Sequence, residues 1–204
     1  MIAPKFTGMI FGAALAACTQ PLQDSAPKIG ACGSASNPEA ATERLSAAET
    51  TRPCRLAAIE RLREVFTVRA VEALLKNLEF PREEIVVRKE GVVTLSGRDI
   101  GLGGYPAASA LVLMGRKRPE LVVPMLRAAL RDGDLSPAAI SKGTYALNLI
   151  YIEDPALAVA ALHQEAQAAV RPGRRSALEE IAQGWVTRCP PDDQAKCRAA
   201  LVTR

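Results

Sequence analysis

The stretch PAASALVLMG at residues 106–115, followed by LVVPMLRAAL at residues 121–130, decides the fold. Its apolar residues recur every three or four positions, which is the period of one face of an α-helix. The same apolar pattern returns 36 residues later in both halves of the stretch. The matched pairs are Ala110 and Ala146, Leu111 and Leu147, Met114 and Ile150, Val123 and Val159, and Leu126 and Leu162. A shift shared by every pair predicts a repeated helical hairpin.

Partial copies flank these two hairpins. The upstream copy lies 49 to 52 residues before the first hairpin, and this larger offset predicts an insertion between them. The downstream copy is followed by a last predicted helix around residues 193–202. The upstream matches are Leu62, Val65, Val71 and Leu74, and the downstream ones are Ala177, Leu178 and Ile181. The chain therefore predicts a mainly α fold with about seven to nine helices.

Folded structure is expected from residue 37 onward. In Asn37-Pro38-Glu39, asparagine can cap a helix, proline suits the first helical position, and glutamate complements the positive helix end. The first helix is predicted to reach about Glu49, and the next begins near Pro53. The helix that begins near Pro53 and the helix after it each have one apolar face. These faces consist of Leu56, Ala58, Ile59, Leu62 and Val65, and of Val68, Val71, Leu74, Leu75 and Leu78.

The segment PAASALVLMG…VVPMLRAAL resembles a HEAT-type repeat, with an Ala-x-x-Ala-Leu-like first helix and a Val-Pro-x-Leu-like step in the second. The resemblance covers roughly residues 53–185. It implies an α-solenoid whose hairpins bury their apolar faces against one another and leave a concave surface that binds proteins. HEAT repeats share no catalytic residues, so the resemblance implies no active site. Other helical-hairpin solenoids and an Ala-rich bundle are compatible with the same spacing.

The insertion, at about residues 82–104, contains the one segment typical of β-strands. Two β-branched runs within residues 84–96 flank a charged turn at Gly91, which predicts a β-hairpin packed on the helices. Residues 84–97 resemble the core of a BON domain, an α/β envelope module that binds phospholipid in some family members. The matching motif is Val87-x-x-x-Gly91-Val92-Val93-Thr94-Leu95-x-Gly97. A BON domain needs a third strand where this chain returns to a helical pattern, so a decorated solenoid is favoured.

The first 18 residues resemble a bacterial lipoprotein signal peptide that ends in the lipobox Leu15-Ala16-Ala17-Cys18. Lys5 precedes an uncharged stretch of about a dozen residues, too short for a membrane-spanning helix, which needs about 20. The resemblance implies removal of residues 1–17 and a lipid anchor on Cys18. Inner-membrane lipoproteins often carry Asp after the lipidated cysteine, so with Thr19 at this position the resemblance favours the outer membrane, facing the periplasm, over the inner membrane. The alternative, an N-terminal helix of the folded domain, lacks a polar face.

Four cysteines remain after Cys18, and their even number suits an oxidising compartment. Four cysteines allow three pairings, and short separations favour Cys32 with Cys54 and Cys189 with Cys197. Residues 18–36 mix Pro, Gly, Ser and Ala without a period and are interpreted as a lipidated tether, ahead of a domain at residues 37–204. The sequence has no Cys-x-x-Cys pair and one histidine, so no metal site is predicted.

Two basic groups fall at predicted turns between helices: Arg116-Lys117-Arg118, and Arg171 with Arg174 and Arg175. In a regular stack the two groups could share one edge and contact anionic headgroups or an acidic partner. The alternative is ordinary solvated turns, with the charges favourable near helix ends. The formal net charge of +4 drops to +3 once Lys5 is removed, and this balance does not indicate nucleic-acid binding.

No motif in the chain indicates a nucleotide site or catalysis. The glycine cluster at residues 97–104 lacks the Gly-Lys-Ser/Thr ending of a phosphate loop and is interpreted as a flexible connector. Residues 141–144 (SKGT) resemble the start of a helix, and His163 has no evident nucleophile or orienting carboxylate. Acid pairs such as Glu179 with Glu180 are typical of solvated helix faces. We therefore expect no enzyme activity and no cofactor.

These patterns predict a membrane-anchored periplasmic lipoprotein that acts as a non-catalytic scaffold for protein–protein interactions. Its expected partners are the lipid bilayer, through acylated Cys18, and another envelope protein. Two alternatives remain open. One is a BON-like phospholipid-binding envelope module, and the other is an inhibitor or immunity lipoprotein that binds an envelope-targeted enzyme.

Overall fold

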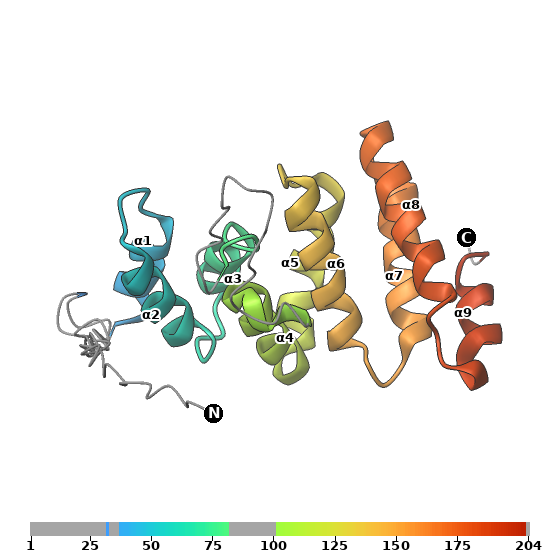
Figure 1. Ribbon diagram of the computed structural model, residues 1–204, viewed down its shortest axis with the longest axis horizontal. Helices are drawn as coiled ribbons and strands as arrows, with labels where there is room; N and C mark the ends of the chain where they lie inside the picture. The colour runs from blue at the N-terminus through green and yellow to red at the C-terminus, as the bar shows by residue number, and fades with distance from the viewer. Residues whose placement is uncertain (1–31, 33–36, 82–100, 203–204) are drawn as a thin grey trace, which may run out of the picture.

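The computed structural model describes residue 32, residues 37–81 and residues 101–202. Within these residues the fold is mainly α-helical, as expected, with nine α-helices (Figure 1). They are α1 (Pro38–Ser46), α2 (Arg52–Leu62), α3 (Val68–Leu75), α4 (Pro106–Lys117), α5 (Pro119–Asp132), α6 (Pro137–Ile150), α7 (Pro155–Ala168), α8 (Pro172–Val186) and α9 (Gln194–Ala200). Two 3-10 helices, η2 (Gly101–Gly104) and η3 (Pro191–Asp193), precede α4 and α9.

Several expected features lie outside the described residues. They are the signal peptide at residues 1–17, Cys18, the tether at residues 18–36 apart from Cys32, and the β-hairpin near residues 84–96 with its BON-like segment. In the described part of the chain, no helix combines the length and the apolarity that crossing a bilayer requires.

Proline marks the start of most helices, because the first helical position needs no amide hydrogen. The helices α1, α4, α5, α6, α7 and α8 all begin with proline. Side-chain caps reinforce several of these starts, and Asn37 Oδ1 accepts a hydrogen bond from Glu39 N at 2.9 Å. The predicted start of α1 is therefore confirmed, although α1 ends at Ser46, three residues before the expected Glu49.

The helices pack in two rows. In the first row α2 contacts α4, and α4 contacts α6. In the second row α1 contacts α3, α3 contacts α5, α5 contacts α7, and α7 contacts α9. Consecutive helices also pack across the rows, so the helices follow one another in chain order from α1 at one end of the molecule to α9 at the other (Figure 1).

The helix α8 is the exception to this arrangement. It packs extensively on α7 and also contacts α9, but it does not pack closely on α6. The first row is therefore interrupted between α6 and α8, although both helices belong to the described chain.

Most of the apolar repeat positions lie in the core. Leu111, Met114, Leu126, Leu147 and Leu162 are all fully buried. The prediction is wrong at Val68, which is 52% exposed because it is the first residue of α3 and precedes the buried residues of that helix. In the downstream copy Leu178 is buried, whereas Ala177 and Ile181 are only half-buried.

Both favoured disulfides form. The bond between Cys32 and Cys54, with a Cα–Cα distance of 5.1 Å, joins residue 32 to α2. The bond between Cys189 and Cys197 joins the segment after α8 to α9, inside a small second core that also contains Val159 and Val186. This second core holds the last helix against α7 and α8.

The end of the glycine cluster is structured. Residues 101–104, which were expected to belong to a flexible connector, form the 3-10 helix η2. Leu102 is only 5% exposed because η2 packs against α4 and α6, and this apolar contact orders the turn.

Candidate functional site

The first predicted basic group lies at the turn between α4 and α5. Arg116 donates from Nε and Nη2 to the carbonyl oxygen of Leu149, at 3.0 and 2.8 Å, and so ties this turn to the end of α6. Arg118 donates to Glu120, and this hydrogen bond lowers the pKa of the glutamate. Lys117 is exposed. Two of the three cations therefore make contacts within the protein.

The second basic group contains a buried arginine. Arg174 is 8% exposed, and its guanidinium donates to the carbonyl oxygens of Leu130, Gly133 and Leu135 at 2.9 to 3.0 Å. Burial lowers the pKa of Arg174. This side chain satisfies carbonyl groups at and beyond the end of α5, where a helix has no amide donors for them. Arg174 is therefore placed to stabilise the fold.

The other two arginines of this group are exposed. Arg171 lies 3.7 Å from the carboxylate of Asp134, and Arg175 donates to the carbonyl oxygen of Ala169 at 3.2 Å. The pair of Arg171 with Asp134 lies at the surface, where water competes for the same groups, whereas the hydrogen bond of Arg175 is partly buried.

The two basic groups do not share an edge. Arg118 immediately precedes α5, whereas Arg174 contacts the other end of that helix, at Leu130. At a rise of 1.5 Å per residue, the two ends of this helix are about 20 Å apart. The α4–α5 and α7–α8 turns lie on opposite edges of the stack, because the first basic group is at the start of α5 and Arg174 is at its end. An anionic-partner contact at either group alone stays a prediction.

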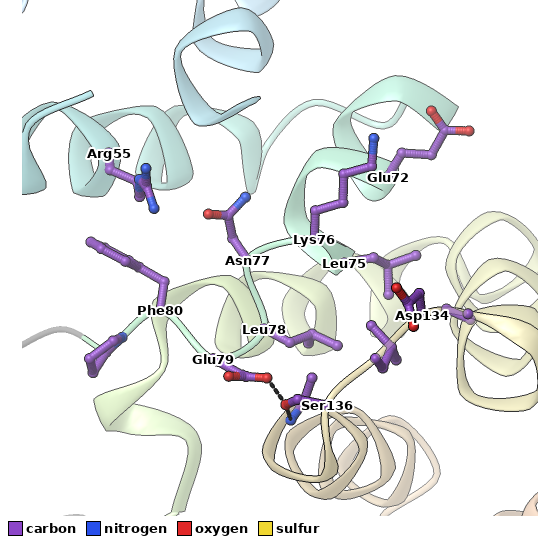
Figure 2. Close-up of a pocket in the computed structure, with 15 residues that line it drawn as sticks. Arg55, Glu72, Leu75, Lys76, Asn77, Leu78, Glu79, Phe80, Asp134 and Ser136 are labelled. Atoms are coloured by element: carbon purple, nitrogen blue, oxygen red, sulfur yellow. Dashed lines mark hydrogen bonds between the residues drawn. The ribbon is translucent and has the colours of Figure 1, made fainter. Parts of the chain in front are cut away.

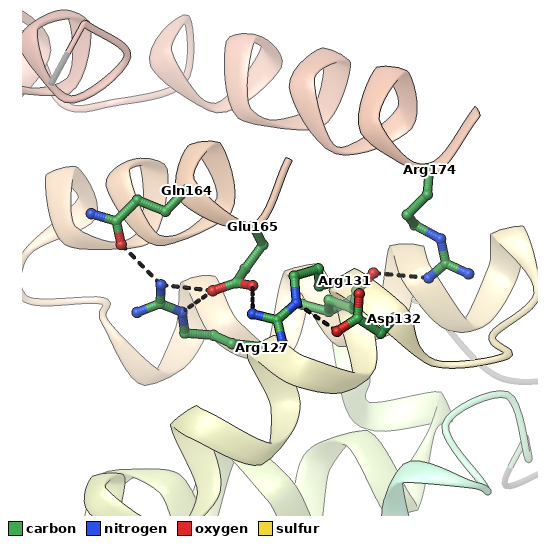
Figure 3. A network of polar contacts seen from close by, with 7 residues as sticks. Arg127, Arg131, Asp132, Gln164, Glu165 and Arg174 are labelled. Carbon is green, nitrogen blue, oxygen red and sulfur yellow. Dashed lines mark hydrogen bonds and ion pairs between the residues drawn. The ribbon is translucent and has the colours of Figure 1, made fainter. Parts of the chain in front are cut away.

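A buried carboxylate closes the junction between α5 and α7 (Figure 3). The Glu165 side chain on α7 is 6% exposed. Arg127 Nε donates to Glu165 Oε1 at 2.7 Å, and Arg131 Nη1 donates to Oε2 at 3.2 Å. Arg127 also donates to Gln164, at 2.9 Å. Each oxygen of the buried carboxylate therefore has a cationic donor from the neighbouring hairpin.

Arg131 makes a further contact on its own helix. Its Nε donates to Asp132 Oδ2 at 2.6 Å, and this hydrogen bond is the main reason that the pKa of Arg131 is raised. Sequence analysis missed this network, because the partners on α5 and α7 are 34 and 38 residues apart and follow no repeat spacing.

A cavity of about 740 Å³ lies between the end of α3 and the α5–α6 turn (Figure 2). Its charged lining mixes both signs, with Arg55 and Lys76 facing Glu72, Glu79 and Asp134. Such a mixture gives the cavity no preference for one ligand charge.

Ser136 is the hydroxyl group in this cavity. It donates to Glu79 and accepts from the amide of Ala139 at 3.1 Å, so it caps the start of α6. A hydroxyl held in this way serves the helix end rather than standing ready as a nucleophile.

Two arginines stack on Phe80, a residue that lines the same cavity. The guanidinium groups of Arg52 and Arg55 lie 5.2 and 5.1 Å from the centre of the Phe80 ring. Arg52 also donates to the carbonyl oxygen of Pro81 at 2.7 Å. These cation–π contacts hold the segment after α3 against α2.

A second hollow, a groove of about 730 Å³, separates α6 from α8. The α8 wall is a stripe of residues spaced three or four apart, which places them on one face of the helix. The stripe consists of Ala177, Glu180, Ile181, Gly184 and Trp185, and Arg188 lines the groove from the turn that follows α8. From α6 come Lys142 and Tyr145, and Leu102 of η2 also lines the groove. The groove thus occupies the interruption in the first row of helices.

The groove is open, and its lining is about as polar as it is apolar, with Ser141 and Thr144 of α6 beside the aromatic side chains. Tyr145 is 38% exposed, while Ile181 and Trp185 are half-buried. A β-carbon added to Gly184 would meet no atom within 4 Å, so there is free space above this part of α8. Trp185 is the single tryptophan of the chain.

The charges of the groove are spread along its length. Lys142 Nζ lies 3.7 Å from the centre of the Tyr105 ring. Arg188 is exposed, and its guanidinium makes no hydrogen bond or ion pair with another described residue. Glu180 is also exposed, two turns earlier on α8. The sequence does not indicate this groove. Two of its residues, Ala177 and Ile181, are repeat positions for which burial was expected.

The remaining candidate for chemistry is His163, which lies partly exposed on α7. Within the described residues, no group of three or more His, Cys, Asp or Glu side chains is arranged to hold a metal ion. Comparisons with protein-family models, with curated proteins and with solved structures found no match to this chain.

Proposed function

We propose that this protein is a lipid-anchored envelope protein whose helices form a HEAT-like solenoid and act as a non-catalytic scaffold for another protein. The two-row packing supports the solenoid, because every described helix except α8 contacts a helix two places along the chain as well as its neighbour. Such stacks present long, fixed surfaces, and these surfaces suit protein partners.

The α6–α8 groove is the observation that carries the binding function. It gathers an exposed tyrosine, a half-buried tryptophan and an exposed arginine, the three residue types most enriched in the energetic centres of protein interfaces. The tyrosine and the tryptophan lie on helices and the arginine lies in the turn directly after α8, so a partner would find a preformed surface. The described cavities offer no comparable grouping of catalytic side chains, and the larger one contains a hydroxyl that is used as a helix cap.

The lipid anchor rests on the lipobox that ends at Cys18. The Cys32–Cys54 disulfide supports a short connection, because it fixes residue 32 to α2 and leaves only residues 19–31 between the anchor and the first point of attachment. The solenoid would then stay within reach of the membrane that holds the partner. Outer-membrane placement, on the periplasmic side, remains part of this proposal.

Two measurements test the proposal in cells that make the full chain. Metabolic labelling with a palmitate analogue should mark the protein, and Cys18→Ser should abolish both the label and the membrane association. A photo-crosslinking amino acid placed in turn at Leu113, Leu157 and Gly184 should yield protein adducts from at least one of these surface positions. Adducts with lipid alone, or none from any position, would contradict the scaffold.

A further inference from the structure

We infer that the α6–α8 groove is the docking site of an amphipathic α-helix from the partner protein. The helix would place apolar side chains against Ile181 and Trp185 and a carboxylate against Arg188. This inference rests on the proposed scaffold function and names the part of the surface, and the kind of partner, that the scaffold uses.

The shape of the groove favours a helix as its occupant. The helices α2, α4 and α6 lie against one another in the first row, but α6 and α8 do not. Packed helices have axes 8–10 Å apart with the side chains of one lying in the grooves of the other. A helix laid between α6 and α8 would make this kind of contact with both walls at once.

The repeat explains why this face of α8 is apolar. Ala177 and Ile181 occupy the positions that Ala110 and Met114 occupy in the earlier hairpin. Ala110 and Met114 are 2% and 0% exposed, whereas Ala177 and Ile181 remain half-buried because no helix of the first row packs on them. A docked helix would bury these two side chains as the neighbouring helix does in the earlier repeat.

The charges of the groove select an acidic helix. Arg188 lies in the turn after α8, its side chain is paired with no acidic group of the described residues, and Glu180 is eight residues earlier in the chain. Lys142 on the opposite wall adds a second cation, already placed over the Tyr105 ring. A carboxylate near Arg188 would gain a charge-assisted hydrogen bond, whereas a basic residue there would be repelled.

Two glycines of α8 provide a matched pair of probe positions. An added β-carbon meets no atom within 4 Å at either Gly184, in the groove, or Gly173, in the first turn. A photo-crosslinking amino acid at each position, in the full chain in cells, should give a protein adduct at residue 184 and none at residue 173. Mass spectrometry should place the adduct on the apolar face of an Asp- or Glu-containing helix.

The outcomes of this experiment separate the inference from the proposed function. Protein adducts at Leu113 or Leu157 without one at residue 184 would overturn the groove and leave the scaffold standing. A crosslink from residue 184 to another part of the same molecule, to a second copy of the protein or to lipid would also overturn the docking site. Failure at every position would overturn both.

Trp185 then reports binding directly. A synthetic peptide of the crosslinked segment, with any tryptophan replaced by phenylalanine, should shift the Trp185 emission of the full-length protein in lipid nanodiscs. Gly184→Phe should weaken binding at least about tenfold, because its ring fills the free space, whereas Gly173→Phe should bind normally. Equal affinities for the two variants would overturn the inference, and matching thermal melts would show that both are folded.

The charge step has its own test. Arg188→Glu should lower the affinity for the peptide about tenfold. Changing the peptide carboxylate that faces residue 188 to lysine should restore most of this affinity. Arg188→Glu with unchanged affinity, or a loss that the reversed peptide does not restore, would contradict the contact.

Discussion

The α5–α7 and α6–α8 junctions lie on either side of the α6–α7 hairpin, yet one is closed and the other is open. At the closed junction, Glu165 receives hydrogen bonds from two arginines of the neighbouring hairpin. At the open junction, Tyr145 and Trp185 line a groove that no described side chain fills. The contrast shows that the two rows of one stack differ at this point, because a network of charged side chains closes one and the other leaves a groove.

The helix α8, which forms one wall of the open junction, is fixed by contacts on its other side. α8 packs along α7, Arg174 links it to the end of α5, and the Cys189–Cys197 disulfide secures the segment that follows. The groove walls are therefore set before any partner arrives, which reduces the ordering cost of binding. The closed side of the stack thus prepares the open side for its proposed role.

The largest expected effect comes from removing a core side chain at the closed junction. Leu162 on α7 is fully buried, so Leu162→Ala should lower the free energy of unfolding by about 2–5 kcal/mol. Tyr145→Ala on the open side should cost less than about 1 kcal/mol, because this side chain is already 38% exposed. Urea denaturation followed by circular dichroism measures both, and equal losses would erase the distinction.

The next effect concerns the arginine behind the groove. Arg174→Met keeps the aliphatic stem but leaves three carbonyl groups without their donor, and should cost about 2–3 kcal/mol. Arg175→Met, on the exposed side of the same turn, should cost no more than about 0.5 kcal/mol. Thermal melts of the two variants provide the comparison, and a neutral Arg174→Met would show that these hydrogen bonds are dispensable.

Removing a carboxylate should also affect stability differently at the closed and the open junction. Glu165→Ala should lower the free energy of unfolding by about 2 kcal/mol, less than for a fully buried ion pair, because the arginine partners reach solvent and can be rehydrated. Glu180→Ala on the groove wall should change it by less than about 0.5 kcal/mol. Similar values for the two substitutions, measured by urea denaturation, would mean that the network does not hold the junction.

The smallest expected change in stability comes from replacing a glycine with alanine. Gly184→Ala should raise the free energy of unfolding by up to about 1 kcal/mol, since alanine favours the helix and its β-carbon meets open space. At Gly143 on α6 the added β-carbon would lie 3.0 Å from Leu130 Cδ2, so Gly143→Ala should gain nothing or lose stability. Calorimetric melting temperatures rank the pair, and an equal gain at both glycines would show that the interior side is not tightly packed.

Much of the helical pattern was predictable from local signals. Proline at the start of a helix acts through the backbone of one residue, and so does the Asn37 cap. The 36-residue shift identified core positions such as Leu111 and Leu147 because burial of an apolar face follows helical periodicity. The cysteine pairs were short enough in separation for their pairing to follow as well.

The candidate site was less predictable. The basic turns were visible in the sequence, but their separation along α5 and the burial of Arg174 depend on which ends of the helices meet. Arg127 and Glu165 have no spacing that marks them as partners. Trp185 and Arg188 became groove residues only because α8 stands away from α6.

The sequence by itself determined where the helices begin, which of their faces are apolar, and that a hairpin repeats, because these properties depend on residues within a few turns of one another. Only the tertiary structure decided that α5 and α7 close around Glu165 while α6 and α8 leave a groove. The physical reason is that the angle and distance between helices follow from the simultaneous packing of many side chains distant in sequence. No local sequence pattern determines the combined result of these packing contacts.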